Sequence, residues 1–174
     1  KDHMTLCAAL GSFLPKNPNV HFLFVGRRWP FYGELYDRVF ELCRSMNLLR
    51  QVHFLGHRED IGDILADLDL LVMATEHDTF GIAVVEALFS RVPVLATDTP
   101  AMREVLGGGT FGLLTPPRDA QAMVRWLTAA VSGDLALGRM REAAYAWAQS
   151  EFSIGAHVAH LRQFYTGVVK KGRC

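Results

Sequence analysis

The chain has 174 residues, of which 50% are hydrophobic and 21% are charged, and its formal net charge at pH 7 is zero. These values indicate a single globular domain and argue against intrinsic disorder and against a nucleic-acid binder that depends on a basic surface. No apolar run reaches the roughly 18 residues that a membrane-spanning helix needs.

Short apolar runs alternate with helical patterns along most of the chain. The expected strands are residues 20–25, 52–55, 68–74, 92–97 and 111–115. The expected helices between them are residues 34–46, 60–68, 80–90 and 100–106. This alternation is typical of βαβ units, so we predict a Rossmann-like, doubly wound parallel α/β sheet with helices on both faces.

The C-terminal tail is predicted to contain helices only. Asp119 is placed to cap a helix that begins at residue 120, and Ser153 is placed to cap one that begins at residue 154. In the last helix an apolar stripe recurs at helical spacing, and we expect it to pack in the core. The stripe consists of Val158, Leu161, Phe164, Tyr165 and Val168.

Cysteine and histidine usage gives no sign of a metal site or a disulfide framework. Cys7, Cys43 and Cys174 are odd in number and have no CxxC spacing, and the seven histidines form no HExxH pair. We therefore expect no metal and a cytoplasmic location, where thiols stay reduced. The opening "KDHMTLCAAL" is typical of a helix start without a preceding strand, so we expect residues 1–174 to be a fragment of a longer protein.

The loop after residues 68–74 is the first place to look for a ligand site, because doubly wound sheets bind ligands outside the carboxyl ends of their strands. This loop, "TEHDTFG", leads into the helix expected at residues 80–90. A helix N-terminus attracts phosphate through its free N–H groups and partial positive charge, and Gly81 allows a ligand to approach the backbone closely.

Two acids, Asp78 and Glu86, lie eight positions apart in this segment. The helical neighbours of Glu86, three and four positions away, include only one polar residue, Ser90. A carboxylate on such a face needs a partner, and a ligand hydroxyl would serve. The alternative is that Glu86 emerges at the helix edge and caps a structural group. Asp78 just before a helix is most often an N-cap.

Other polar residues near strand ends leave two interpretations open. Arg27 and Arg28 follow an expected strand and either meet phosphate or are solvated charges. Arg58 could contact a base or a phosphate, whereas Asp60 is expected to cap the helix that follows. His77 beside Asp78 is more often a surface residue than a general base.

Taken together, these motifs resemble the C-terminal, donor-binding domain of GT-B glycosyltransferases, in the large retaining group called family 4 or group 1. The resemblance covers roughly residues 1–130, through "VHFLFVG", "VHFLGHRED", "ILADLDLLVMATEHDTFGIAVVEALFSRVPVLATD" and "FGLLTPPRD". Its most specific element is the pair of acids, with Phe-Gly after the first and a Pro-Val strand after the second. These residues are Asp78, Phe80, Gly81, Glu86, Pro93 and Val94.

The resemblance implies a role for each matching residue. Glu86 would bind the ribose hydroxyls of a nucleotide-diphosphate sugar, and Asp78 would face the donor sugar, which makes both acids catalytic candidates. Lys1 would neutralise the diphosphate, and Arg58 would lie beside the base. The remaining donor contacts would come from Thr79, Phe80, Gly81 and Ile82. Such groups stabilise charge on the departing nucleoside diphosphate, so no metal or other cofactor is implied.

The family pattern also has departures in this chain. The first acid is usually Glu, but here it is Asp78, one methylene shorter. Arg91 replaces a usual Gly, and Pro100-Ala101 replaces a common Gly-Gly pair. An Arg that usually precedes the Lys is absent.

For the whole protein, the resemblance implies a retaining hexosyltransferase in which residues 1–174 form the single nucleotide-sugar-binding domain. Its partners would be the donor and an N-terminal acceptor domain of the same chain, with no nucleic acid. The fragment alone would be inactive, and the full-length enzyme would associate peripherally with the inner face of the membrane. One alternative is a nucleotide-sugar-binding module without catalytic activity. Another, a nicotinamide-dependent oxidoreductase, is disfavoured because no GxGxxG follows a strand.

Overall fold

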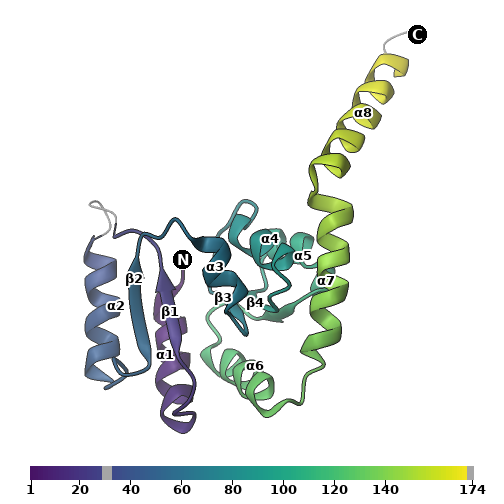
Figure 1. Cartoon of the computed structure of the whole chain (residues 1–174). Coiled ribbons are helices and arrows are strands. Elements are labelled where there is room, and N and C mark those ends of the chain that lie inside the picture. Colours follow the sequence, from purple (N-terminus) through teal and green to yellow (C-terminus); the bar gives the residue numbers. More distant parts are fainter. Residues whose placement is uncertain (29–32, 172–174) are drawn as a thin grey trace.

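The computed structural model describes residues 1–28 and 33–171, so Cys174 and part of the loop at residues 26–34 lie outside these ranges. Strands and helices alternate along the chain, and the C-terminal part is helical (Figure 1). The elements are α1 (His3–Phe13), η1 (Leu14–Lys16), β1 (Phe22–Val25), α2 (Gly33–Ser45), β2 (Val52–Gly56), α3 (Ile61–Ala66), β3 (Leu71–Met73), α4 (Ile82–Phe89), β4 (Val94–Thr97), α5 (Pro100–Val105), η3 (Gly107–Gly109), β5 (Leu113–Thr115), α6 (Ala120–Ser132), α7 (Leu137–Phe152) and α8 (Ile154–Lys171).

Every strand pair is parallel, which confirms the predicted α/β class. The strands nevertheless form two sheets, one with the order β1-β2 and one with the order β3-β4-β5. The two sheets stand beside each other, with the N-terminus between them (Figure 1). The predicted class and the five parallel strands are therefore correct, but the strands do not form one continuous sheet, because β1 and β3 are not joined by hydrogen bonds.

Burial differs sharply between the strands. All four residues of β4 are buried, because β4 lies between two strands and its side chains pack against α4 and α5. In β1 and β3, by contrast, no residue is fully buried, and Val25 is 39% exposed. A second cluster of buried side chains, which includes Leu10 and Leu14, packs α1 against α2 and α6.

Helix caps explain several of the element boundaries. The Asp119 carboxylate accepts the Ala122 N–H at 2.7 Å, and the Ser153 hydroxyl accepts the Ala156 N–H at 3.2 Å, which confirms both predicted caps. Asp60 precedes α3 as predicted but makes no capping hydrogen bond, because its carboxylate is held by a neighbouring guanidinium.

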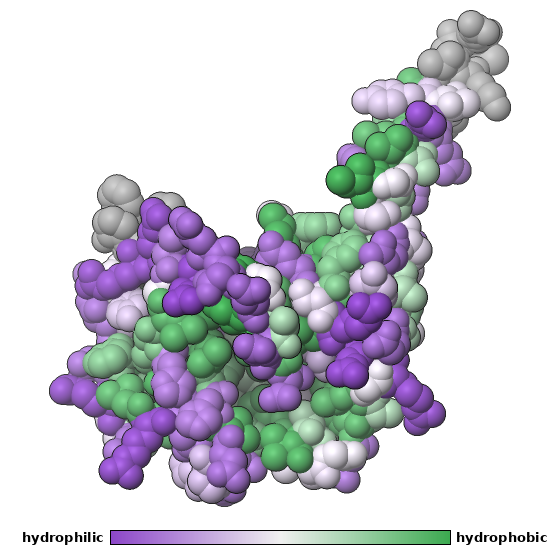
Figure 2. Space-filling model, in the orientation of Figure 1, coloured by the Kyte–Doolittle hydropathy of each residue, from purple (hydrophilic) through white to green (hydrophobic). Residues whose placement is uncertain are grey.

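The prediction that the apolar stripe of the last helix packs in the core is wrong. Helix α8 continues away from the body after α7, and apolar side chains run along one of its sides (Figures 1 and 2). All five stripe residues are exposed, from 40% at Leu161 to 65% at Phe164. The pattern correctly indicated an amphipathic helix, but no described element covers its apolar side. Among the described residues, no helix is long and apolar enough to cross a membrane.

Candidate functional site

Buried threonines frame the carboxyl ends of β3, β4 and β5. They are the buried polar residues of the described chain, and they are Thr75, Thr97, Thr99 and Thr115. The Thr75 N–H donates to Thr97 Oγ1 at 3.1 Å, and Thr75 Oγ1 donates to the His77 carbonyl at 2.9 Å. These bonds anchor the loop that follows β3 to the end of β4, so the sheet edge fixes the start of the acid-bearing segment.

Gly81 ends this loop and begins α4. Its φ of 84° and ψ of 55° place it in the left-handed region, which glycine adopts readily. A Cβ at this position would also lie 2.4 Å from Met102 Cε. No side chain caps α4, so its first N–H groups are open to a ligand. The hypothesis that Asp78 is the N-cap of this helix is wrong, because Gly81 holds that position.

Asp78 instead pairs with Lys1, which lies 77 positions before it in the sequence. The two side chains form an ion pair, and the Asp78 carboxylate also accepts the Phe80 N–H at 3.3 Å. The hydrogen bond from Lys1 holds the pKa of Asp78 below its ordinary value, and the Phe80 N–H acts in the same direction. The Lys1 side chain is 44% exposed, so its charge faces solvent as well as Asp78.

A cavity of about 630 Å³ gathers most of the predicted site. Its wall is formed by α4, the loop before it, and the facing parts of β1, α3 and β3. The predicted residues that line it are Lys1, Asp78, Thr79, Phe80, Gly81, Ile82 and Glu86. A cation, two carboxylates and the uncapped end of a helix therefore border one space, which suits a ligand that carries both phosphate and hydroxyl groups.

Glu86 lies one turn into α4 and is exposed to this cavity. Within residues 1–28 and 33–171 its carboxylate has no hydrogen bond or ion pair. Ile82, on the same side of the helix, is 67% exposed. The face around Glu86 is thus open at Ile82, although Phe89 packs against the core. The alternative that Glu86 caps a structural group finds no partner in the described chain.

A second cavity, of about 520 Å³, adjoins the first at Lys1 and Asp78. Pro100 and Ala101 line it, so the pair that replaces the usual Gly-Gly lies next to the first acid. Glu76 lines it as well and is held by Arg118 through two bonds of 2.5 and 2.6 Å. This hydrogen bonding keeps the pKa of Glu76 below its ordinary value, so an ionised, already paired carboxylate stands at the rim.

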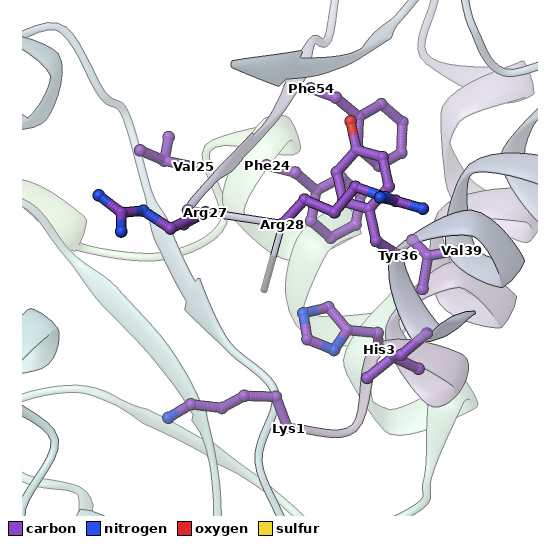
Figure 3. A pocket seen from close by; sticks show the side chains of 11 residues that line it. Lys1, His3, Phe24, Val25, Arg27, Arg28, Tyr36, Val39 and Phe54 are labelled. Carbon is purple, nitrogen blue, oxygen red and sulfur yellow. The ribbon is translucent and has the colours of Figure 1, made fainter. Parts of the chain in front are cut away.

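A third cavity, of about 500 Å³, opens on the other side of Lys1. Figure 3 shows the rings of Phe24, Tyr36 and Phe54 gathered together, with His3 near them. Burial is the main cause that lowers the pKa of His3. This aromatic wall was not predicted from the sequence, because its rings come from β1, α2 and β2 and share no local motif.

The basic residues of the two other loops are placed differently. Arg27 and Arg28 line the third cavity, and in Figure 3 their side chains point in opposite directions. Asp37 holds the Arg28 guanidinium at 3.2 and 2.6 Å. Arg58 does not line any of the three cavities and pairs with Asp60, two residues away. His77 is exposed at the rim of the second cavity.

Sequence comparison relates the chain to known transferases. The family model described as glycosyl transferases group 1 matches residues 1–147. The lipopolysaccharide core biosynthesis mannosyltransferase LpsB of Rhizobium meliloti is 33% identical over 119 residues, which are 65% of this chain and 33% of that protein. A phosphatidyl-myo-inositol mannosyltransferase of Mycolicibacterium smegmatis is 32% identical over 137 residues, 77% of this chain and 33% of that protein. The chain thus spans about a third of the length of these curated relatives.

Solved structures share the fold. Anabaena Alr3699/HepE in complex with UDP superposes with a TM-score of 0.87 at 23% identity, over 96% of this chain and 45% of that one. The C-terminal domain of a group 1 family protein, LpcC, from Francisella tularensis gives a TM-score of 0.76 at 22% identity, over 86% of this chain and 78% of that one. At such identities the likeness establishes the architecture.

Proposed function

Because the chain belongs to the group 1 glycosyltransferases, we propose that it is the donor-binding part of a retaining, family 4 enzyme that transfers a sugar from a nucleotide-diphosphate sugar to an acceptor. The observation that carries this proposal is the shared cavity of Lys1, Asp78, Glu86 and the uncapped start of α4. The complex of Anabaena Alr3699/HepE with UDP supports a nucleoside diphosphate as the ligand class.

The diphosphate would lie at the N-terminus of α4, within reach of the Lys1 ammonium. Helix N–H groups and a cation stabilise the negative charge that develops on the leaving nucleoside diphosphate, and they are already oriented before the reaction. Gly81 keeps this end of the helix free of a Cβ. These groups are hydrogen-bond donors, and they suit an anion without a resident metal.

The two acids would bind opposite ends of the donor. Glu86 is unpaired in the described chain and faces the cavity, so it is free to accept hydrogen bonds from the ribose hydroxyls. Asp78 lies at the junction of the first two cavities, where the sugar would be held by Asp78, Thr79 and the Phe80 N–H. Arg58 would approach the base only after it leaves Asp60.

The acceptor site would come from an N-terminal domain of the full-length protein. The match covers only 33% of each of the two curated relatives, so most of their length lies outside it. We place the complete enzyme in the cytoplasm, associated peripherally with the inner face of the membrane. Residues 1–174 alone would bind the donor without transferring its sugar. A donor-binding module that has lost catalysis would keep the same cavity, and activity of the full-length protein distinguishes the two.

Isothermal titration of UDP, GDP and ADP into the chain tests the site. Binding of one diphosphate by the wild-type protein should weaken by about 1–3 kcal/mol in Glu86→Gln, the scale of a hydrogen bond to a charged group. Glu104→Gln is the matched control, because Glu104 is exposed on α5 and lines none of the three cavities. Equal affinities of the two variants would exclude Glu86 from the donor site.

A further inference from the structure

Two histidine side chains lie against each other on the sheet formed by β1 and β2. His21 directly precedes β1, and His53 is the second residue of β2. His21 Nδ1 and His53 Nε2 are 3.0 Å apart, and the two rings stack with centroids 5.2 Å apart and an interplanar angle of 26°. Neither residue lines any of the three cavities described above. The pair is therefore separate from the proposed donor site.

The strand register places both rings on one face of this sheet. Leu23 lies opposite His53 in the parallel pair. Side chains two positions apart on a strand point to the same face, so His21 projects from the same face as Leu23 and His53. Phe24 and Phe54 point to the other face and pack against the core. His21 is exposed and His53 is half-buried, so an ion from solvent can reach the pair.

The backbone before His21 is attached to the strand that carries His53. The Gln51 side chain, two positions before His53, donates to the carbonyls of Asn17 and Val20 at 2.8 Å each. The Gln51 carbonyl accepts an N–H from the first residue of β1 at 2.7 Å. The two histidines thus share one hydrogen-bonded frame, and a ligand that both rings hold would lose little affinity to the ordering of the chain.

The short distance between the two ring nitrogens restricts what can lie between them. A neutral imidazole has one N–H donor and one nitrogen with a free lone pair. Two nitrogens at 3.0 Å therefore share either a proton, in an N–H···N hydrogen bond, or a cation that both lone pairs can bind. Neutral imidazole is the commonest metal ligand in proteins, so a metal ion can take the place of the shared proton.

The same distance indicates the class of metal ion. Nitrogens that lie about 2.0–2.1 Å from a metal and 3.0 Å from each other subtend roughly 90–100° at the ion. This angle suits neighbouring positions of the square-planar or tetragonal geometry that Cu²⁺ and Ni²⁺ adopt with nitrogen ligands. A tetrahedral ion such as Zn²⁺ would need the nitrogens roughly 3.3 Å apart.

We propose that His21 and His53 form a two-histidine chelate for a divalent transition-metal ion of square-planar or tetragonal preference, Cu²⁺ or Ni²⁺. His21 would bind the ion through Nδ1 and His53 through Nε2. Within residues 1–28 and 33–171 no group of three or more His, Cys, Asp or Glu side chains could hold a metal, so water would fill the other positions. The two ligands are 32 positions apart in the sequence, so no local motif indicates them. The proposal does not depend on the function proposed for the donor cavity.

Isothermal titration with Cu²⁺, and separately with Ni²⁺, tests the chelate in a buffer that does not bind metal. The amino terminus of the chain is acetylated, so that the terminal amine is not a ligand. His21→Ala and His53→Ala each remove one ligand. His57→Ala is the matched control, because His57 is exposed in the loop after β2. Sedimentation with and without metal gives the number of chains that bind each ion.

The wild type and His57→Ala should bind one ion per chain at this site, at least tenfold more tightly than either His21→Ala or His53→Ala. The double variant should be no weaker than the single ones, because the loss of either ring breaks the chelate. Cu²⁺ should also raise the urea midpoint of the wild type and of the control but not of the two variants, since an ion that binds only the folded chain stabilises it.

Three results would overturn the proposal. The first is wild-type binding no tighter than that of His21→Ala or His53→Ala. The second is a rise of the urea midpoint with Cu²⁺ that is equal in the wild type and in these two variants. The third is an ion held only between two chains, because the two rings of one chain would then not be sufficient to bind it.

Discussion

Gly81→Ala tests whether the backbone at the start of α4 is fixed by both conformation and packing. At a φ of 84°, an added Cβ costs about 1–2 kcal/mol. That Cβ would lie 2.4 Å from Met102 Cε, and the buried Met102 side chain cannot swing into solvent, which adds an overpacking cost of about 1–3 kcal/mol. The lower entropy of the unfolded variant offsets about 0.4–1 kcal/mol. We therefore expect a net destabilisation of about 2–4 kcal/mol.

Urea unfolding measures this loss, and Gly62→Ala is the control. Gly62 lies in α3, and an added Cβ there meets no heavy atom within 4 Å, so alanine should leave the free energy of unfolding unchanged or raise it slightly. Combining Gly81→Ala with Met102→Ala isolates the contact term, because the double variant should be more stable than the sum of the two single effects. The reasoning would be refuted if Gly81→Ala were as stable as Gly62→Ala. It would also be refuted if the double-mutant cycle gave no coupling energy between Gly81→Ala and Met102→Ala.

Three further outcomes are expected. In the full-length enzyme, Asp78→Asn should lower turnover by about ten- to a hundredfold, the scale of a lost preorganised contact, and leave nucleoside diphosphate affinity nearly unchanged; normal turnover would remove Asp78 from catalysis. Because the folded-state pKa of Asp78 is depressed, its stabilisation is present above its ordinary pKa of about 3.9 and is lost as the pH falls through the folded value. The gap between the urea midpoints of wild type and Asp78→Asn should thus stay constant from pH 7 down to about pH 4 and close as the pH falls further, and a gap that persists at lower pH would contradict this. Residues 1–174 should bind a nucleoside diphosphate in a thermal-shift assay but transfer no sugar, and detectable transfer by this chain alone would disprove the need for an acceptor domain.

Local signals in the sequence were sufficient for the five strands and for several helices, and most of the predicted site residues line one cavity. Apolar runs bounded by turns located all five strands, and Asp119 and Ser153 located two helix starts, because these signals act over only a few residues. Gly81 was singled out for close backbone approach, and the structure adds the reason that Met102 fills the space beside it.

Features that depend on distant parts of the chain could not be predicted. The period of the α8 stripe indicates an apolar face but not what covers it, and Phe164 is 65% exposed. The neighbours of Glu86 are mostly apolar, yet Ile82 lines an open cavity and is 67% exposed. Arg58 follows a strand end, but its guanidinium already forms an ion pair with Asp60, two residues away. The division of the strands into two sheets depends on which strands form hydrogen bonds with each other, and apolar runs in the sequence do not indicate this.

The contacts of the two acids explain why they would respond differently to a donor. Asp78 already has a cationic partner, whereas the Glu86 carboxylate has none within the described ranges. The Lys1 side chain is 44% exposed, so water partly screens its attraction to Asp78, and a diphosphate with two or more negative charges can compete for the ammonium. Asp78 would then be released toward the sugar by the same event that neutralises the phosphates. Glu86 needs no such exchange, because its carboxylate is open to hydroxyl donors from the start.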